Sequence, residues 1–158
     1  VTGVQTCALP ISDIPQVADR EAGILAATAE QRAVVTRIDA GQMTAAAGDA
    51  AVSAAMADGS LTSAIVCAND LLAIGAVRAL TRAGLRVPQD VSVVGYDDID
   101  FAASAVVPLT SVRQPKYELG FAAAQLVIAE FQDPLAHAHQ RVRFQPQIVV
   151  REIGRAHV

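Results

Sequence analysis

Two pairs of polar residues each follow an apolar run in the middle of the chain. The pair Asn69-Asp70 comes after the run SAIVCA, and the pair Asp97-Asp98 comes one residue after the run VSVVG. Carboxylate and amide groups of this kind can hydrogen-bond the hydroxyls of a small polar ligand, and neighbouring carboxylates can also hold Mg²⁺. The elements around the two pairs decide between these chemistries.

The two apolar runs and the segment between them have the pattern of a βαβ unit. Residues 63–68 and 91–95 are short and apolar, as in buried parallel strands, whereas residues 70–83 repeat apolar side chains with helical spacing. Gly84 suits the end of that helix, and Pro88 prevents the helix from resuming. Strands joined in this way are parallel, and the crossover between them is right-handed.

Ligands of open α/β sheets bind outside the carboxyl ends of the strands. Asn69 and Asp97 follow two such strands, so they are placed where a small polar ligand would sit. Asn69 and Asp70 can each cap the helix that follows them. Since one cap suffices, one side chain of this pair is expected to stay free.

A magnesium-dependent phospho-receiver domain is a rival interpretation of the pair Asp97-Asp98. Such a site needs a third acidic residue at a strand end, which Asp39 could supply, and a lysine at the end of a later strand. The only lysine is Lys116, which follows Pro115 at the start of a predicted helix. We therefore do not expect a receiver.

The same stretch resembles a known family, the effector-binding domain of lactose-repressor-type (LacI/GalR) transcription regulators. The motifs that carry the resemblance are AND (68–70), AIGA (73–76), GLRVP (84–88), DVSVVGYDD (90–98), PLTSVRQP (108–115) and Gly120. It covers most of residues 13–151. It implies a periplasmic-binding-protein-like fold of type I, an open parallel sheet flanked by helices, present here mainly as one truncated lobe.

The resemblance also implies the ligand contacts. Arg20 and Gly23 match the family's Arg-x-x-Gly, which implies that Arg20 points into the cleft and pairs with ligand hydroxyls or a carboxylate. Asn69 is implied to face the ligand, and Asp97 to bind its hydroxyls. Met43 stands where the family usually has an aromatic that stacks on the ligand ring, so packing on an apolar sugar face is expected instead.

Asp98 is expected to accept hydrogen bonds from nearby backbone N–H groups. The resemblance further implies a homodimer, because the family pairs the helix at 70–83 and the loop after the next strand across a two-fold axis. The implied interface residues are Leu71, Ile74, Arg78 and Phe101.

The resemblance divides the chain between two lobes. Residues 12–108 and 140–151 are expected to form the C-terminal lobe, and residues 109–133 a crossover strand and helix that belong to the other lobe. That helix is apolar nearly all round, which independently favours burial on most of its sides. The further elements predicted are a helix within 12–30, a helix at 45–57 with Thr44 as its N-cap, and strands at 33–38, 109–113, 141–144 and 147–150.

The two ends of the chain differ in character from the rest. Residues 1–11 and 152–158 resemble translated sequencing-adapter read-through, and we expect them to be non-native. The parent protein is then expected to be longer and to bind operator DNA through an N-terminal helix-turn-helix that is missing here.

Composition argues against several functions for the residues present. The 158-residue chain is 53% hydrophobic and 18% charged, and its net charge of −4 argues against a nucleic-acid surface. No apolar run reaches the ~18 residues of a membrane helix. The sequence contains no nucleophile motif and no nucleotide-binding glycine loop, so neither enzymatic activity nor a cofactor is expected.

The cysteines and histidines suggest no special chemistry. Cys67 lies in a predicted buried strand, and two cysteines imply no disulfide framework, which fits a reducing cytoplasm. His137 and His139 form a His-x-His pair in a loop, but no cluster of other ligands supports a metal site.

The sequence therefore predicts the effector-binding domain of a DNA-binding, ligand-controlled repressor in the cytoplasm. The expected effector is a sugar or another small polar metabolite. The alternative is the substrate-binding protein of a sugar transporter, which shares this fold and would have the same cleft.

Overall fold

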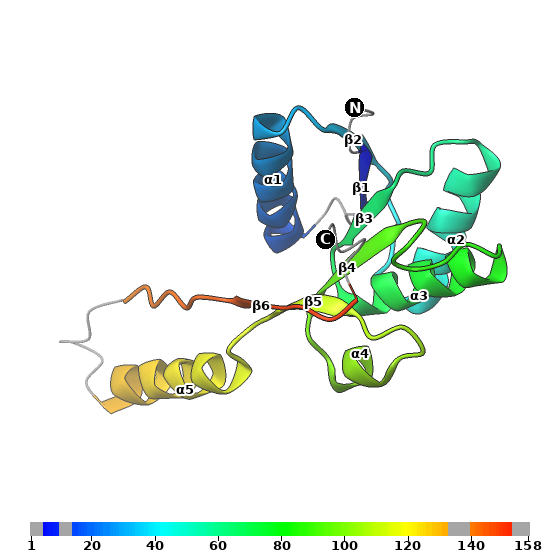
Figure 1. Cartoon of the computed structure of the whole chain (residues 1–158). Helices are drawn as coiled ribbons and strands as arrows, with labels where there is room; N and C mark the ends of the chain where they lie inside the picture. Colours follow the sequence, from blue (N-terminus) through cyan, green and yellow to red (C-terminus); the bar gives the residue numbers. More distant parts are fainter. Residues whose placement is uncertain (1–4, 10–13, 133–139, 153–158) are drawn as a thin grey trace.

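The computed structural model describes residues 5–9, 14–132 and 140–152, and for residues 5–9 the backbone alone. The elements, in chain order, are β1 (Gln5–Leu9), α1 (Pro15–Glu30), β2 (Val34–Arg37), α2 (Ala45–Ala57), β3 (Ala64–Cys67), α3 (Asp70–Arg82), β4 (Ser92–Asp97), α4 (Asp100–Ser104), β5 (Thr110–Arg113), α5 (Lys116–Gln132) and β6 (Gln147–Val149) (Figure 1).

The described strands form one sheet in the order β2-β1-β3-β4-β5-β6. Strands β1 to β5 pair in parallel, and β6 pairs antiparallel to β5. The predicted α/β fold, an open sheet flanked by helices, is confirmed, with the difference that its last strand makes the sheet mixed.

Two stretches near the chain ends bear on the predicted strands. Residues 147–149 form β6 as expected, but the strand predicted at 141–144 is wrong, because these residues have no strand partner in the described part of the chain. Alternation of polar and apolar residues does not make a strand without a neighbour to pair its backbone.

Strand β1 lies within residues 1–11 and pairs with both β2 and β3. The non-native origin of residues 1–11 stays a prediction.

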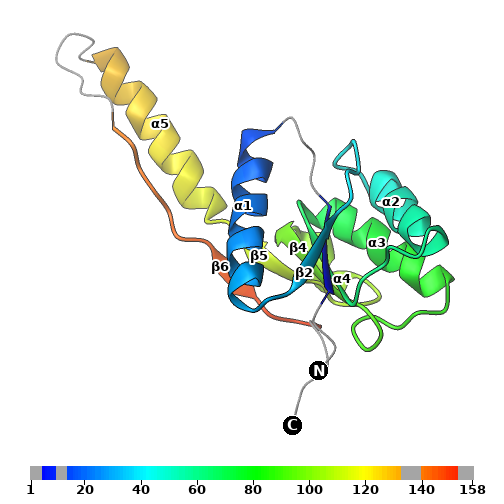
Figure 2. The ribbon, with the colours of Figure 1, turned by 90° about the horizontal axis from the view of Figure 1, so that it is seen from above.

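The helices cover both faces of the sheet. Helices α2 and α3 lie on one face and α1 lies on the other (Figures 1 and 2). This follows from handedness, because the connection through α1 runs toward one edge of the sheet and those through α2 and α3 run toward the other. Right-handed crossovers in opposite directions place their helices on opposite faces.

The core lies between the sheet and the pair α2–α3. Ile65 and Val93 of the sheet and Leu72 and Leu80 of α3 are at most 1% exposed. The two helices approach closely at Gly75, where a Cβ atom would lie 2.0 Å from the carbonyl oxygen of Ala45. The tight contact fixes α3, and α3 begins at the residues that the sequence singles out.

The predicted helix boundaries are confirmed by their local geometry. Thr44 caps α2, its Oγ1 accepting a hydrogen bond from the N–H of Ala47 at 3.2 Å. Gly84 follows α3 with a φ of +80°, in the left-handed region that glycine adopts without a steric penalty. Helix α3 is therefore closed at its C-terminus as predicted.

Helix α5 differs from the other long helices because none of its residues is buried. In both views α5 and the residues 140–146 that precede β6 extend away from the sheet (Figures 1 and 2). Residues 110–113, which the expected division gives to the other lobe, form β5 inside this sheet, with Thr110 and Ser111 fully buried.

Candidate functional site

The carboxyl ends of β3 and β4 form one corner of the sheet. The two strands are parallel neighbours, with Ala64 paired to Ser92 and Val66 to Val94. Asn69 follows β3 by two residues, and Asp97 is the last residue of β4. The two residues singled out in the sequence therefore lie at the same edge, where parallel sheets bind ligands.

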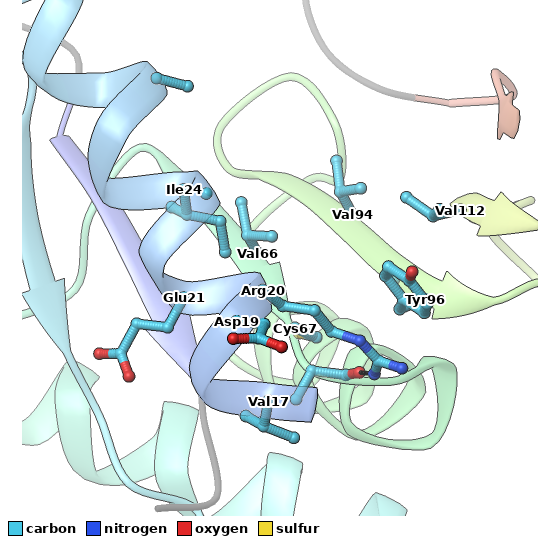
Figure 3. Close-up of a pocket in the computed structure, with 14 residues that line it drawn as sticks. Val17, Asp19, Arg20, Glu21, Ile24, Val66, Cys67, Val94, Tyr96 and Val112 are labelled. Carbon is cyan, nitrogen blue, oxygen red and sulfur yellow. Dashed lines mark hydrogen bonds between the residues drawn. The ribbon is translucent and has the colours of Figure 1, made fainter. Parts of the chain in front are cut away.

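Arg20 reaches the same corner from α1. Its Nη1 donates a hydrogen bond to the carbonyl oxygen of Ala68 at 2.6 Å, and its guanidinium carbon lies 3.6 Å from the centroid of the Tyr96 ring (Figure 3). Ala68 and Tyr96 directly precede Asn69 and Asp97 in sequence. The cation–π contact and the hydrogen bond hold the guanidinium at the strand ends.

A pocket of about 420 Å³ opens between α1 and the sheet beside this arginine. Arg20 and Ile24 line it from α1, and Val66, Val94 and Val112 are among the residues that line it from three neighbouring strands (Figure 3). Most of its wall is apolar, and the described residues that line it include Arg20 but neither Asn69 nor Asp97.

Asn69 is buried and caps α3. Its Oδ1 accepts a hydrogen bond from the N–H of Leu72 at 2.9 Å, and its Nδ2 donates to the carbonyl oxygen of Met43 at 3.5 Å. The second contact is at the limit of hydrogen-bond length, so Nδ2 is the group of Asn69 that a ligand could engage. Met43 is partly buried against the core, with its backbone beside Asn69.

Asp70 is not free either, so the expectation that one side chain of the pair stays unengaged is wrong. Its carboxylate accepts hydrogen bonds from the hydroxyl of Ser111 at 2.5 Å and from the N–H of Ile99 at 2.8 Å, and the residue is 1% exposed. Burial, together with the nearby charges of Asp97 and Asp98, raises the pKa of this carboxyl against the opposing effect of the two hydrogen bonds. Gly95 leaves the space for it, because a Cβ atom there would lie 2.1 Å from Oδ1 of Asp70.

Asp97 and Asp98 form a turn with unusual backbone angles. Their φ values are +102° and +47°, in a region that residues other than glycine rarely adopt. Oδ1 of Asp97 accepts a hydrogen bond from Nε2 of Gln114 at 2.7 Å. The surroundings hold the carboxylate of Asp97 at the edge of the sheet.

The role expected of Asp98 is wrong. Its carboxylate accepts hydrogen bonds from Nε of Arg113 at 2.6 Å and from Nη1 of Arg151 at 2.8 Å, and not from the backbone. Charged donors bind a carboxylate more strongly than amides do, which explains the preference. The N–H of Ile99, which directly follows Asp98, donates instead to the carboxylate of Asp70.

Two residues of this corner, Tyr96 and Gln114, were not predicted as site residues from the sequence. Gln114 directly follows β5, which is the parallel neighbour of β4, so the strand-end rule that selects Asn69 and Asp97 also selects Gln114 once the strand order is known. Tyr96 lies two residues after Val94 in β4, so both side chains point to the same face of the sheet, and both line the pocket.

The expected interface residues lie on a different surface, along α3 and α4. Leu71 is 42% exposed and Phe101 is 57% exposed. Ile74, Arg78 and Phe101 line a groove of about 250 Å³. Arg78 also donates from Nε to Oδ2 of Asp49 at 2.6 Å, so it is part of an ion pair between α2 and α3.

The described residues contain no cluster of three or more histidine, cysteine or acidic side chains that could hold a metal ion. His137 and His139 lie outside the described residues. None of the described helices combines the length and the apolar character needed to cross a bilayer. Cys67 is buried in β3.

Comparison with known proteins gives consistent matches. The sequence model of a family described as periplasmic binding protein-like domain matches residues 6–152. Over 104 residues, or 66% of this chain, the sequence is 44% identical to the HTH-type transcriptional regulator MalR of Streptomyces coelicolor. The match covers 29% of MalR, so the chain spans less than a third of the length of this relative.

Two solved structures have the same fold. The lac repressor dimer bound to operator and the anti-inducer ONPF superposes with a TM-score of 0.80 at 26% identity, over 97% of this chain and 53% of that one. A complex of the transcriptional regulator CelR with cellobiose superposes with a TM-score of 0.83 at 29% identity, over 95% of this chain and 46% of that one.

Proposed function

Because this chain belongs to the periplasmic binding protein-like domain family, in its LacI/GalR type, we propose that it is part of the effector-binding domain of a DNA-binding, ligand-controlled repressor. One observation carries this proposal. Arg20 on α1 contacts Ala68 and Tyr96, the residues directly before Asn69 and Asp97, at the carboxyl ends of neighbouring parallel strands.

The proposed effector is a carbohydrate. The corner offers the donors of Arg20 and of the Asn69 amide together with the acceptors of Asp97, and sugar hydroxyls both donate and accept. The backbone carbonyl oxygen of Met43 lies beside Asn69, and the resemblance implies that its side chain packs on an apolar face of the sugar. A neighbour in complex with cellobiose supports this class of ligand.

The parent protein binds operator DNA through a helix-turn-helix outside this chain and acts in the cytoplasm as a homodimer. The net charge of −4 leaves this chain a poor surface for phosphates, and MalR is named as an HTH-type regulator. The dimer forms along Leu71, Ile74, Arg78 and Phe101, where apolar side chains are exposed beside a groove. The names of the matched relatives favour this function over a transporter component.

Thermal-shift measurements on the intact parent protein test the choice of effector. The panel contains cellobiose, maltose, lactose, galactose and glucose, with a purine base as a polar ligand of another class. We expect at least one sugar to raise the melting temperature, because a ligand that binds only the folded state stabilises it. Stabilisation by the purine alone would contradict the carbohydrate proposal.

A further inference from the structure

We infer that Asp98 is a positioning residue for the effector site. Its carboxylate bonds to the two chain segments on either side of α5, and these bonds fix the turn that carries Asp97. The effector contact of Asp97 itself is part of the function proposed above. The contacts of Asp98 that we call the tie, its bonds to Arg113 and Arg151, are made within the protein and do not depend on any ligand.

One carboxylate holds both segments. Oδ2 of Asp98 accepts from Nε of Arg113, the last residue of β5, and Oδ1 accepts from Nη1 of Arg151, two residues after β6. The side chain of Asp98 is 6% exposed and that of Arg151 is 18% exposed. Arg151 is anchored in turn, since its Nη1 also donates to the carbonyl oxygen of Leu109 at 2.8 Å.

The backbone of the turn is tied to the same segment. The N–H of Asp98 donates to Oγ of Ser111 in β5 at 3.1 Å. Nζ of Lys116, the first residue of α5, donates to the carbonyl oxygen of Asp98 at 3.1 Å. With Gln114 bound to Asp97, four residues between 111 and 116 contact the turn.

The turn needs these ties because of its conformation. Asp97 and Asp98 both have positive φ, which such residues keep only where the surroundings hold them. If the ties are lost, the turn relaxes and the carboxylate of Asp97 leaves its place beside the ends of β3 and β4. Because the same ties hold β5 and the segment after β6, a movement of α5 relative to the sheet reaches the effector site through them.

The charges of the cluster favour an ionised Asp98. Burial alone would raise the pKa of this carboxyl, but the hydrogen bonds and positive charges of Arg151 and Arg113 lower it overall. Removing one arginine leaves a buried carboxylate with half of its charged partners, which is costly.

Hydrogen–deuterium exchange on the intact parent protein tests the tie without a ligand. Arg82→Gln is a matched control, since Asp49 is likewise a buried aspartate held by two arginines, Arg78 and Arg82. We expect Arg151→Gln to speed exchange in the segments 93–103 and 109–118 by roughly tenfold, as for a lost hydrogen bond to a charged group, and Arg82→Gln to leave them unchanged. The inference would be overturned if Arg151→Gln exchanged these two segments at the wild-type rate. It would also be overturned if Arg82→Gln sped their exchange as much as Arg151→Gln does.

A second variant covers the case in which Arg151→Gln does not fold. Arg113 is 52% exposed and its removal disturbs the core less. Arg113→Gln should speed exchange in the same two segments, and wild-type exchange in this variant would equally count against the tie.

Calorimetry with the sugar that most raises the melting temperature adds the functional readout. Arg151→Gln and Asp98→Asn should each weaken its binding by roughly tenfold, Arg151→Lys should restore part of the loss, and Arg82→Gln should bind like wild type. Unchanged affinity in both site variants would overturn the positioning role. If no sugar binds, the carbohydrate proposal fails and the exchange measurement decides about the tie.

Discussion

Asp97 presents a carboxylate whose two oxygens have different surroundings. Oδ1 accepts from Nε2 of Gln114, whereas Oδ2 accepts no hydrogen bond from the described residues. The geometry thus leaves one acceptor at the edge of the sheet for a ligand hydroxyl.

Asp97→Ala in the intact parent protein should weaken effector binding by about 1.5–3 kcal/mol, the contribution of a hydrogen bond to a charged group. Isothermal titration calorimetry with the stabilising sugar measures the change. Asp58→Ala, at the C-terminal end of α2, serves as a control at the surface, and an affinity equal to wild type in Asp97→Ala would remove Asp97 from the site.

At the level of residues, the sequence predicted which polar residues follow the strands but not how each side chain is engaged. Asn69 and Asp97 could be predicted because strand ends can be recognised from apolar runs. The partners of Asp70 and Asp98 could not be predicted. Ser111 lies 41 residues from Asp70 and Arg151 lies 53 residues from Asp98, and only the strand order brings these residues together. The same holds for Arg20, whose hydrogen bond to Ala68 spans 48 residues.

Helices α2 and α3 are joined by an ion-pair cluster as well as by close backbone contact. Asp49 on α2 accepts from Arg78 and from both terminal nitrogens of Arg82 on α3. The hydrogen bonds from Arg82 and Arg78 hold the pKa of Asp49 well below its usual range, against the opposing effect of burial.

The lowered pKa of Asp49 predicts a specific loss of stability in acid. A carboxyl whose pKa is lower in the folded than in the unfolded state stabilises the fold above the unfolded value of 3.8, and that contribution is lost as the pH falls through the folded value. Urea unfolding of the intact protein at several values between about pH 6 and pH 3 should therefore show a smaller loss for Asp49→Asn than for wild type. Parallel pH profiles would contradict the ion-pair account.

The groove between α3 and α4 predicts the oligomeric state. Ile74 lines the apolar groove beside Phe101, so Ile74→Asp should place an unpaired charge in the proposed dimer interface and give monomers of the parent protein. Sedimentation velocity measures this, with Arg86→Ala as a control, since Arg86 pairs with Asp90 in the connection after α3. A dimeric Ile74→Asp variant would move the interface elsewhere.

At the level of elements, the strands and helices with a clear period and clear caps were predicted to within two residues. The strand at 141–144 failed because alternation alone does not supply a partner. The antiparallel direction of β6 could not be predicted, because pairing direction depends on the path of the chain through α5 and not on local sequence.

Among the described helices, only α5 buries none of its residues. Helix α5 exposes Tyr117 at 77% and Phe131 at 87%, with Phe121, Val127 and Ile128 each more than half exposed. We continue to propose that α5 packs in the other lobe of the parent protein, where these side chains would be buried.

This arrangement predicts the behaviour of the 158-residue chain expressed alone. It should aggregate or bind a hydrophobic dye strongly, and it should bind no effector, since contiguous apolar patches beyond a few hundred Å² drive association. Fluorescence of the dye and light scattering measure both properties. A monomer with a sharp cooperative melt and low dye binding would show that the chain is a complete domain.

The coupling of effector and DNA in the intact parent protein tests the central claim most directly. Fluorescence anisotropy measures its affinity for a DNA site selected from a genomic library, with and without a saturating concentration of the sugar that raises its melting temperature. An effector acts only through different affinities for two states, so the account predicts a change of about 5- to 150-fold in DNA affinity, reduced in Asp97→Ala. The same DNA affinity with and without the bound sugar would contradict it.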